Sequence, residues 1–102
     1  MTNWTKITAL SDIPKLGSRV VRSSKGDIAV FRTSDDQVFA LHDKCPHKGG
    51  PLSQGIVYGD KVACPLHSWK IHLADGKAEE PDVGETACFS VKVEDGTVYL
   101  EL

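Results

Sequence analysis

The stretch Cys45-Pro46-His47 is followed, after a spacer of sixteen residues, by Cys64-Pro65-Leu66-His67. Each motif pairs one cysteine with one histidine, and each follows an apolar run that is typical of a β-strand. Thiolates and imidazoles bind soft or borderline transition metals. A cluster of two irons can bind two thiolates at one iron and two imidazoles at the other. The candidate ligands are Cys45, His47, Cys64 and His67.

At all four of these positions the chain resembles the Rieske [2Fe–2S] family, whose pattern is C-x-H, a spacer and then C-x-x-H. The resemblance implies that Cys45 and Cys64 hold the inner iron of a [2Fe–2S] cluster. It also implies that His47 and His67 hold the outer iron, nearer to solvent. Replacing two thiolates by neutral imidazoles removes negative charge, so the reduction potential rises from about −400 mV to between roughly −150 and +300 mV.

The segments around the ligands indicate one subfamily within the Rieske family. Residues 45–55, 64–69 and 75–78 read CPHKGGPLSQG, CPLHSW and DGKA. They resemble the small subunit of NAD(P)H-dependent assimilatory nitrite reductase, and the resemblance extends over nearly the whole chain. It implies a partner, a large subunit with FAD, sirohaem and a [4Fe–4S] cluster, that reduces nitrite to ammonium. The chain itself would then carry electrons, and no catalytic residue is predicted in it.

Within the Rieske range, the resemblance favours a low reduction potential. High-potential members carry an extra cysteine pair that bridges the ligand loops, and hydroxyl side chains after the second histidine that donate to sulfur. Here the bridging positions hold no cysteine, and Trp69 and Ile71 occupy the hydroxyl positions. Neither side chain can donate an O–H, so we expect a potential at the low end, which a redox titration measures.

Three alternatives remain open from the sequence alone. The first is a free-standing Rieske ferredoxin that donates electrons to an aromatic-ring-hydroxylating dioxygenase. The second is an interaction module with structural zinc, which also binds two cysteines and two histidines. Zinc fingers place their cysteines together and their histidines together, so the order found here fits zinc poorly. The third is a metal-free fold with a disulfide between Cys45 and Cys64.

The composition indicates one small domain that binds neither nucleic acid nor a membrane. The chain has 102 residues, 40% of them hydrophobic and 25% charged, which are ordinary values for a globular domain. Its net charge of −2 leaves no basic excess to meet phosphates. Met1–Lys6 shows no apolar signal region, and no apolar run approaches the length of a membrane span. We therefore expect a cytoplasmic protein, whose three cysteines are two ligands and one spare thiol.

Period-2 alternation and frequent turn residues predict an all-β domain. The expected fold is a Rieske-type antiparallel β sandwich or barrel with an inserted lobe that binds the [2Fe–2S] cluster. A short helical turn is expected at 11–14, and Asp95-Gly96 is a strong hairpin turn. The expected strands are 4–10, 19–23, 27–33, 37–41, 56–58, 61–63, 69–73, 87–94 and 97–102.

The spacer between the two motifs has the length of a loop followed by a hairpin, with Gly59-Asp60 as the turn. Such a hairpin folds back and brings the two ligand loops side by side. We therefore expect a single domain, 1–102, in which residues 44–73 form the cluster-binding lobe. The base would then consist of 1–43 and 74–102.

Other conspicuous residues receive structural roles. Cys88 lies in an alternating strand and is expected to be a buried structural thiol. Trp4 and Phe31 are expected in the core. We expect His42 and His72 to be strand or surface residues and not ligands.

The segment after the lobe contains a proline that the resemblance singles out. Rieske proteins cover the cluster with a proline-bearing loop, and Pro81 is the candidate for that position. The surrounding residues 79–82 are expected to form a solvated loop. Trp69 either shields the cluster from water or fills the core between base and lobe.

Overall fold

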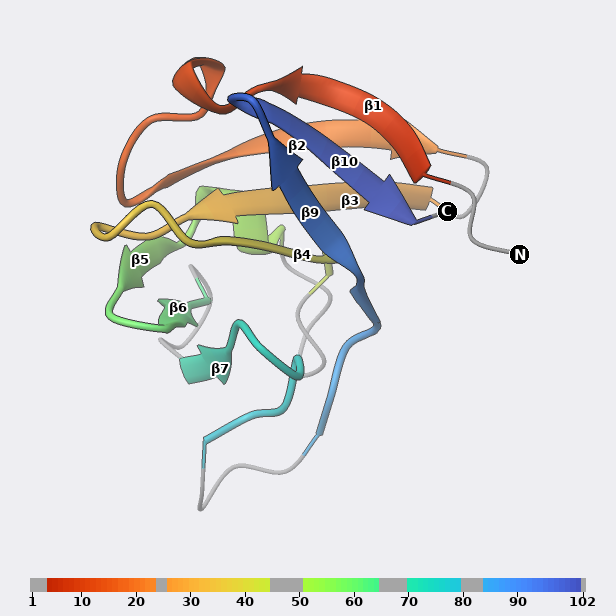
Figure 1. Cartoon of the computed structure of the whole chain (residues 1–102). Coiled ribbons are helices and arrows are strands. Elements are labelled where there is room, and N and C mark those ends of the chain that lie inside the picture. Colours follow the sequence, from red (N-terminus) through yellow and green to blue (C-terminus); the bar gives the residue numbers. More distant parts are fainter. Residues whose placement is uncertain (1–3, 24–25, 45–50, 65–69, 80–83, 102) are drawn as a thin grey trace.

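The computed structural model describes residues 4–23, 26–44, 51–64, 70–79 and 84–101. Within them the chain forms antiparallel strands and two short 3₁₀ helices (Figure 1). The expected all-β fold is therefore confirmed. The elements are β1 (Trp4–Ala9), η1 (Leu10–Asp12), β2 (Gly17–Ser23), β3 (Gly26–Arg32), β4 (Val38–His42), η2 (Leu52–Gln54), β5 (Ile56–Tyr58), β6 (Lys61–Ala63), β7 (Lys70–His72), β8 (Cys88–Phe89), β9 (Val91–Glu94) and β10 (Thr97–Glu101).

The described strands form three sheets, with the orders β1-β10-β9, β2-β3-β4-β8 and β5-β6-β7. The first and last strands are neighbours in one sheet, since Trp4 pairs with Glu101. Figure 1 shows the small sheet β5-β6-β7 below β3 and β4, with β1, β9 and β10 on the other side. The four-stranded sheet is thus the middle layer of the molecule.

Strand β3 is buried on both faces, which explains its uninterrupted apolar run. Ile28, Ala29, Val30 and Phe31 are all 0% exposed. Because side chains alternate along a strand, Ile28 and Val30 face one side and Ala29 and Phe31 face the other. The cross-strand partners agree, since Val30 pairs with Ala40 and shares its hydrophobic cluster.

Each side of this middle layer carries its own core. Toward β1, β9 and β10 lies a base core, made of residues from both base sheets and the loop after η1. Its fully packed members are Ile13, Ile28, Val30, Ala40, Val98 and Leu100. Toward β5, β6 and β7 lies a lobe core, made of residues from the middle sheet, from the small sheet, from η2 and from the positions that follow β6 and β7. Its members are Ala29, Phe31, Leu41, Leu52, Val57, Val62, Cys64, Ile71 and Leu73.

The expected single strand over 87–94 is wrong, because this segment crosses from one sheet to another. Strand β8 pairs with β4, where Cys88 lies opposite Leu41, whereas β9 pairs with β10. Ser90 lies between the two, and its carbonyl accepts a hydrogen bond of 3.0 Å from the amide of Glu101. Local alternation continues across such a crossing, so the pattern alone cannot reveal the change of partner.

Two of the expected core residues are not in the core. Cys88 is exposed, because β8 is a two-residue strand at the edge of its sheet. Trp4 is only half-buried, and the ammonium group of Lys92 lies 4.9 Å from the centroid of its ring. Phe31 is fully buried, as expected.

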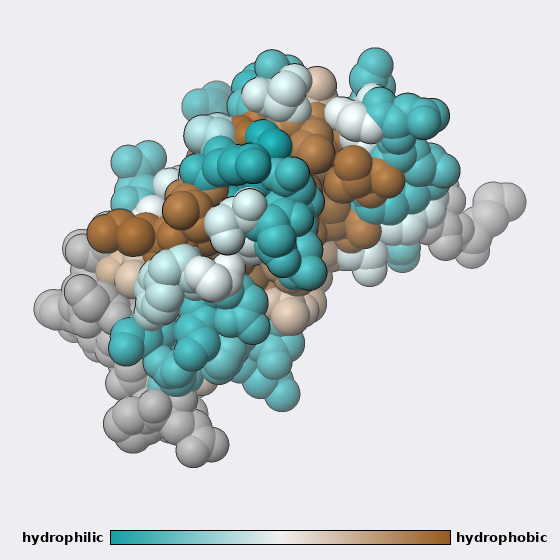
Figure 2. All heavy atoms as spheres, turned by 60° about the vertical axis from the view of Figure 1, so that its left-hand side comes forward, coloured by the Kyte–Doolittle hydropathy of each residue, from teal (hydrophilic) through white to brown (hydrophobic). Residues whose placement is uncertain are grey.

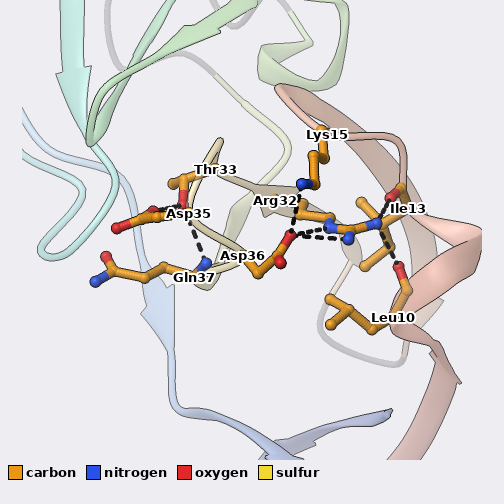
Figure 3. A network of polar contacts seen from close by, with 8 residues as sticks. All are labelled: Leu10, Ile13, Lys15, Arg32, Thr33, Asp35, Asp36 and Gln37. Atoms are coloured by element: carbon orange, nitrogen blue, oxygen red, sulfur yellow. Dashed lines mark hydrogen bonds and ion pairs between the residues drawn. The ribbon is translucent and has the colours of Figure 1, made fainter.

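A polar network centred on Arg32 fixes the segment after β1 against the turn between β3 and β4 (Figure 3). One guanidinium nitrogen, Nη1, donates to the carbonyls of Leu10 and Ile13 at 3.2 and 2.9 Å. The other two, Nε and Nη2, donate to Asp36 Oδ1 at 3.0 and 2.8 Å. This segment contains η1, so a short helical turn is confirmed, but it covers Leu10–Asp12 and not the expected 11–14, since Ile13 is extended.

The surface of the lobe alternates between buried and exposed side chains along β5. Val57 is buried, whereas Ile56 is 71% exposed and Tyr58 is 40% exposed.

On the face that Figure 2 shows, hydrophobic residues form separate patches among hydrophilic ones. In the described part of the chain, no helix has the length and apolar character needed to cross a bilayer.

Candidate metal centre

Cys64 is the one candidate ligand that lies within the described residues. It follows the last residue of β6 and is 1% exposed. Its position comes from the hairpin β5-β6, in which Val57 pairs with Val62 and both side chains are buried in the lobe core. The hairpin therefore delivers the thiol of Cys64 to the interior, at the edge of the same core.

The other three candidate ligands, Cys45, His47 and His67, lie outside the described residues. Trp69 and Pro81, to which roles near the cluster were assigned, lie outside them too. The segments next to these residues are described, and they show where the two ligand loops begin and end. The first ligand loop lies between β4 and η2, and the second lies between β6 and β7.

The end of the first loop lies beside both ends of the second. Ile56, which opens β5 after the first loop, pairs with Ala63, which precedes Cys64. Ala63 also pairs with Lys70, the first residue described after the second loop. The chain thus leaves the first loop next to the start and the return of the second. A hairpin lies between the motifs, as the spacer length predicted, and it places the described residues that flank them side by side.

This close approach depends on a glycine. A Cβ atom added to Gly55 would lie 2.1 Å from the carbonyl oxygen of Ala63 and 3.0 Å from a methyl group of Val62. Any side chain at this position would push β5 away from the end of β6. Gly55 therefore allows the two segments that carry the loops to lie in direct contact.

The surroundings of Cys64 fit a thiolate ligand of the inner iron. Leu52, Ile71 and Leu73 share its cluster, and each is at most 1% exposed. An ionised thiolate is costly in such a setting unless a cation compensates its charge, and a bound iron does so. Ile71 contributes no hydroxyl, in keeping with the expected low potential. Among the residues that the structure describes, no group of three or more His, Cys, Asp or Glu side chains forms a different metal site.

An ion pair that the sequence analysis missed joins β6 to the segment after the lobe. Lys61 Nζ lies 2.5 Å from Glu79 Oε1, and Lys70 Nζ lies 3.9 Å from Glu79 Oε2. The hydrogen bond from Lys61 lowers the pKa of Glu79 below its ordinary value of 4.5, and the same bond raises the pKa of Lys61 above 10.5. Glu79 lies outside any strand and its side chain is 33% exposed, so the expected loop is present at its first residue, and 80–82 lie outside the described residues. The partners are 18 residues apart, and no local pattern pairs them.

The two remaining histidines lie at the ends of strands. His42 is half-buried at the end of β4, and its amide donates to the carbonyl of Ala87 at 2.8 Å. Gly26, at the start of β3, has a φ of 100°, which favours glycine, and a Cβ atom there would lie 2.8 Å from Nε2 of this imidazole, which would have to shift. His72 ends β7, and its amide donates to the carbonyl of Lys77 at 2.9 Å.

Comparison with known proteins shows similarity to Rieske domains over most of the chain. The family model that describes the Rieske [2Fe–2S] domain matches residues 3–90. The ferredoxin CarAc of Metapseudomonas resinovorans is 35% identical over 99 residues, which cover 95% of this chain and 92% of that protein. Other relatives are longer oxygenases, and this chain spans between 17% and 23% of three of them.

Two solved structures have the same fold over nearly their whole length. One is a complex of reduced oxygenase and oxidised ferredoxin in carbazole 1,9a-dioxygenase, with 31% identity, a TM-score of 0.85 and coverage of 99% of this chain and 94% of that one. The other is provisionally described as the small subunit of an NADPH nitrite reductase, with 26% identity, a TM-score of 0.87 and coverage of 98% and 99%. A Rieske domain implies a [2Fe–2S] cluster and an electron-transfer role, which leaves no support for the zinc alternative. The chain belongs to the Rieske [2Fe–2S] domain family.

Proposed function

We propose that this protein is the electron-transfer small subunit of an NAD(P)H-dependent assimilatory nitrite reductase. Its partner would be a large subunit with FAD, sirohaem and a [4Fe–4S] cluster, on which nitrite is reduced to ammonium. Two observations support this assignment: the residues that flank the four ligands, and the full-length likeness to a provisional nitrite reductase small subunit. Because NAD(P)H is the ultimate donor, the expected compartment is the cytoplasm.

The proposal assigns the four ligands to the two irons. Cys45 and Cys64 would hold the inner iron, and His47 and His67 the outer iron. When bound, such a cluster takes up and releases one electron at a time. The chain's own residues bury one thiol and hold the ends of both ligand loops together. Residues 44–73 would form the cluster-binding lobe, and the strands of the small sheet fall within these bounds.

One observation carries the electron-transfer role more than any other. Ile56 and Lys70, which follow the loops around the two motifs, both pair with Ala63, which precedes the buried Cys64. A cluster held there would lie at the edge of the lobe core. The mixed ligands of such a cluster suit a relay that exchanges single electrons with a larger partner.

A second candidate has support from sequence. The ferredoxin CarAc is 35% identical over nearly its full length, and the solved complex contains a ferredoxin together with its oxygenase. In this case the protein would be a free-standing ferredoxin that donates electrons to an aromatic-ring-hydroxylating dioxygenase. The two candidates share the cluster and differ only in the partner.

Reconstitution with each kind of partner separates them. The purified protein is added to a nitrite reductase large subunit with NADH or NADPH, and ammonium formation is measured. In parallel it is added to an oxygenase and its reductase, and product formation is measured. We expect ammonium formation to require this protein, and we expect the Cys64→Ala variant not to support it. Support of the oxygenase alone would replace the proposal with the ferredoxin alternative.

A further inference from the structure

Two hydrogen bonds join the residues that flank the first ligand loop, the one between β4 and η2. The carboxylate of Asp43 accepts from the amide of Ser53 at 2.7 Å through Oδ1, and from the Ser53 hydroxyl at 2.8 Å through Oδ2. Asp43 precedes Cys45 by two residues, and Ser53 follows the loop. The two residues are 10 positions apart, so one carboxylate joins the residue that follows β4 to the short helix η2. Both side chains are half-buried.

Each partner of this contact is itself held in the base. The amide of Asp43 donates to the carbonyl of Asp27 on β3 at 2.9 Å. On the other side, the Ser18 hydroxyl on β2 donates to the carbonyl of Ser53 at 2.8 Å. Helix η2 lies against β2 and β3, and its first residue, Leu52, is 0% exposed in the core that also contains Cys64. The contact thus joins two segments that are already fixed.

We propose that Asp43 and Ser53 are positioning residues for the cluster, acting through the first ligand loop. They would hold the ends of the loop at a fixed separation, so that its cysteine and histidine reach the irons without distortion. This inference rests on the ligands assigned under the proposed function, and it holds for either partner considered there. Charge-assisted hydrogen bonds are among the stronger contacts in proteins, and a bidentate one also fixes orientation.

The atoms that donate and accept show which substitutions are informative. Asp43→Ala removes both hydrogen bonds, and Ser53→Ala removes only the bond from the hydroxyl. Asp43→Asn can keep both, because its amide oxygen accepts from the Ser53 amide and its NH₂ group donates to the hydroxyl oxygen. Asp36→Ala is the matched control, since it removes a carboxylate that also accepts two hydrogen bonds, both from Arg32, away from the loop.

The test measures cluster retention in the purified, cluster-loaded protein. Each variant is mixed with a ferrous-iron chelator under reducing conditions, and the rate of iron release is followed by absorbance. We expect Asp43→Ala to release iron at least about tenfold faster than wild type, Ser53→Ala to lie between the two, and Asp43→Asn to stay within about threefold of wild type. The double variant Asp43→Ala/Ser53→Ala should release iron no faster than Asp43→Ala alone, because both changes break one contact.

A second readout separates positioning from general stability. The EPR line shape of the reduced cluster should change in Asp43→Ala and match wild type in Asp36→Ala, even when both variants have lost the same thermal stability. The inference fails if Asp43→Ala and Asp36→Ala release iron at the same rate, or if Asp43→Ala keeps the wild-type line shape. If Asp43→Ala does not fold, Ser53→Ala decides by the same two measures. Wild-type protein that binds no iron overturns the ligand assignment itself, and this inference with it.

Discussion

Glu79 shows how a single side chain can connect parts of the chain that the sequence keeps apart. It accepts a hydrogen bond from Lys61 at the start of β6, and it lies near Lys70 at the start of β7. Its amide also donates to the carbonyl of Lys70 at 2.8 Å. Glu79 therefore fixes the segment after the lobe onto both neighbouring strands of the small sheet.

The stabilisation that Glu79 provides should depend on pH in a defined way. The bond from Lys61 lowers the pKa of Glu79 below 4.5, so its contribution is complete above that value and is lost as pH falls through the lowered pKa. The pKa of Lys61 is raised above 10.5, so the contribution is complete below that value and is lost at still higher pH. Wild type should therefore exceed Glu79→Gln in stability at neutral pH and lose this advantage as pH falls below 4.5 and through the lowered pKa.

Urea unfolding of both proteins between acidic and alkaline pH measures this difference. Protonation of the cluster ligands affects wild type and variant alike, so it cancels in the comparison. Glu94→Gln is the charge-matched control, because it removes one carboxylate from an exposed pair with Lys92 on β9. If Glu79→Gln lowers the free energy of unfolding by the same amount at acidic and neutral pH, the role of this ion pair is refuted.

At the scale of elements, the hairpin β5-β6 decides where the second motif begins. The hairpin requires glycine at two positions, for different reasons. Gly59 has a φ of 56°, a left-handed conformation that the turn requires, and an added Cβ would meet no atom within 4 Å. Gly55 is required by contact, since an added Cβ would lie 2.1 Å from the carbonyl oxygen of Ala63.

Alanine at these two glycines should therefore have different consequences. Gly59→Ala strains only its own backbone, which costs about 1–2 kcal/mol of unfolding free energy. Gly55→Ala must displace β5 from the end of β6, so we expect a larger loss of stability together with faster iron release. Thermal unfolding and chelator assays on the two variants measure both effects. Equal iron release in the two variants would show that the close approach at Gly55 does not matter for the cluster.

At the scale of the whole molecule, β3 separates a base core from a lobe core (Figure 1). The lobe core contains Cys64 and also side chains from the middle sheet, so the lobe shares its hydrophobic interior with the base. Its packing and the position of the thiol depend on Ala29, Phe31 and Leu41 of the base. The middle sheet is thus the part of the base that packs in the same core as Cys64.

Two matched leucines test this division. Leu52 belongs to the lobe core and Leu100 to the base core, and both are 0% exposed. Substitution of either by alanine should cost about 2–5 kcal/mol of stability. Only Leu52→Ala should also speed iron release from the folded protein, because only that cavity adjoins Cys64. Urea unfolding and chelator assays measure these effects, and a Leu100→Ala variant that loses iron as fast as Leu52→Ala would contradict the separation.

Much of this organisation could be predicted from the sequence, because it rests on local patterns. The turn at Gly59-Asp60 and the alternation around it predict a hairpin between the two motifs, and the structure confirms this hairpin. What could not be predicted depends on partners far away in the chain. The crossing at Ser90 and the exposure of Cys88 follow from which sheet each segment joins, and the ion pair of Glu79 follows from the folded lobe. The roles of Cys45, His47 and His67 stay predictions.

Spectroscopy of freshly purified, anaerobic protein tests the central claim most directly. The account predicts about two irons and two acid-labile sulfides per chain, and an EPR signal after reduction with dithionite. Pulsed EPR of that signal should detect two imidazole nitrogens bound to iron. A protein that is colourless and iron-free, before and after reconstitution with iron and sulfide, would contradict the account.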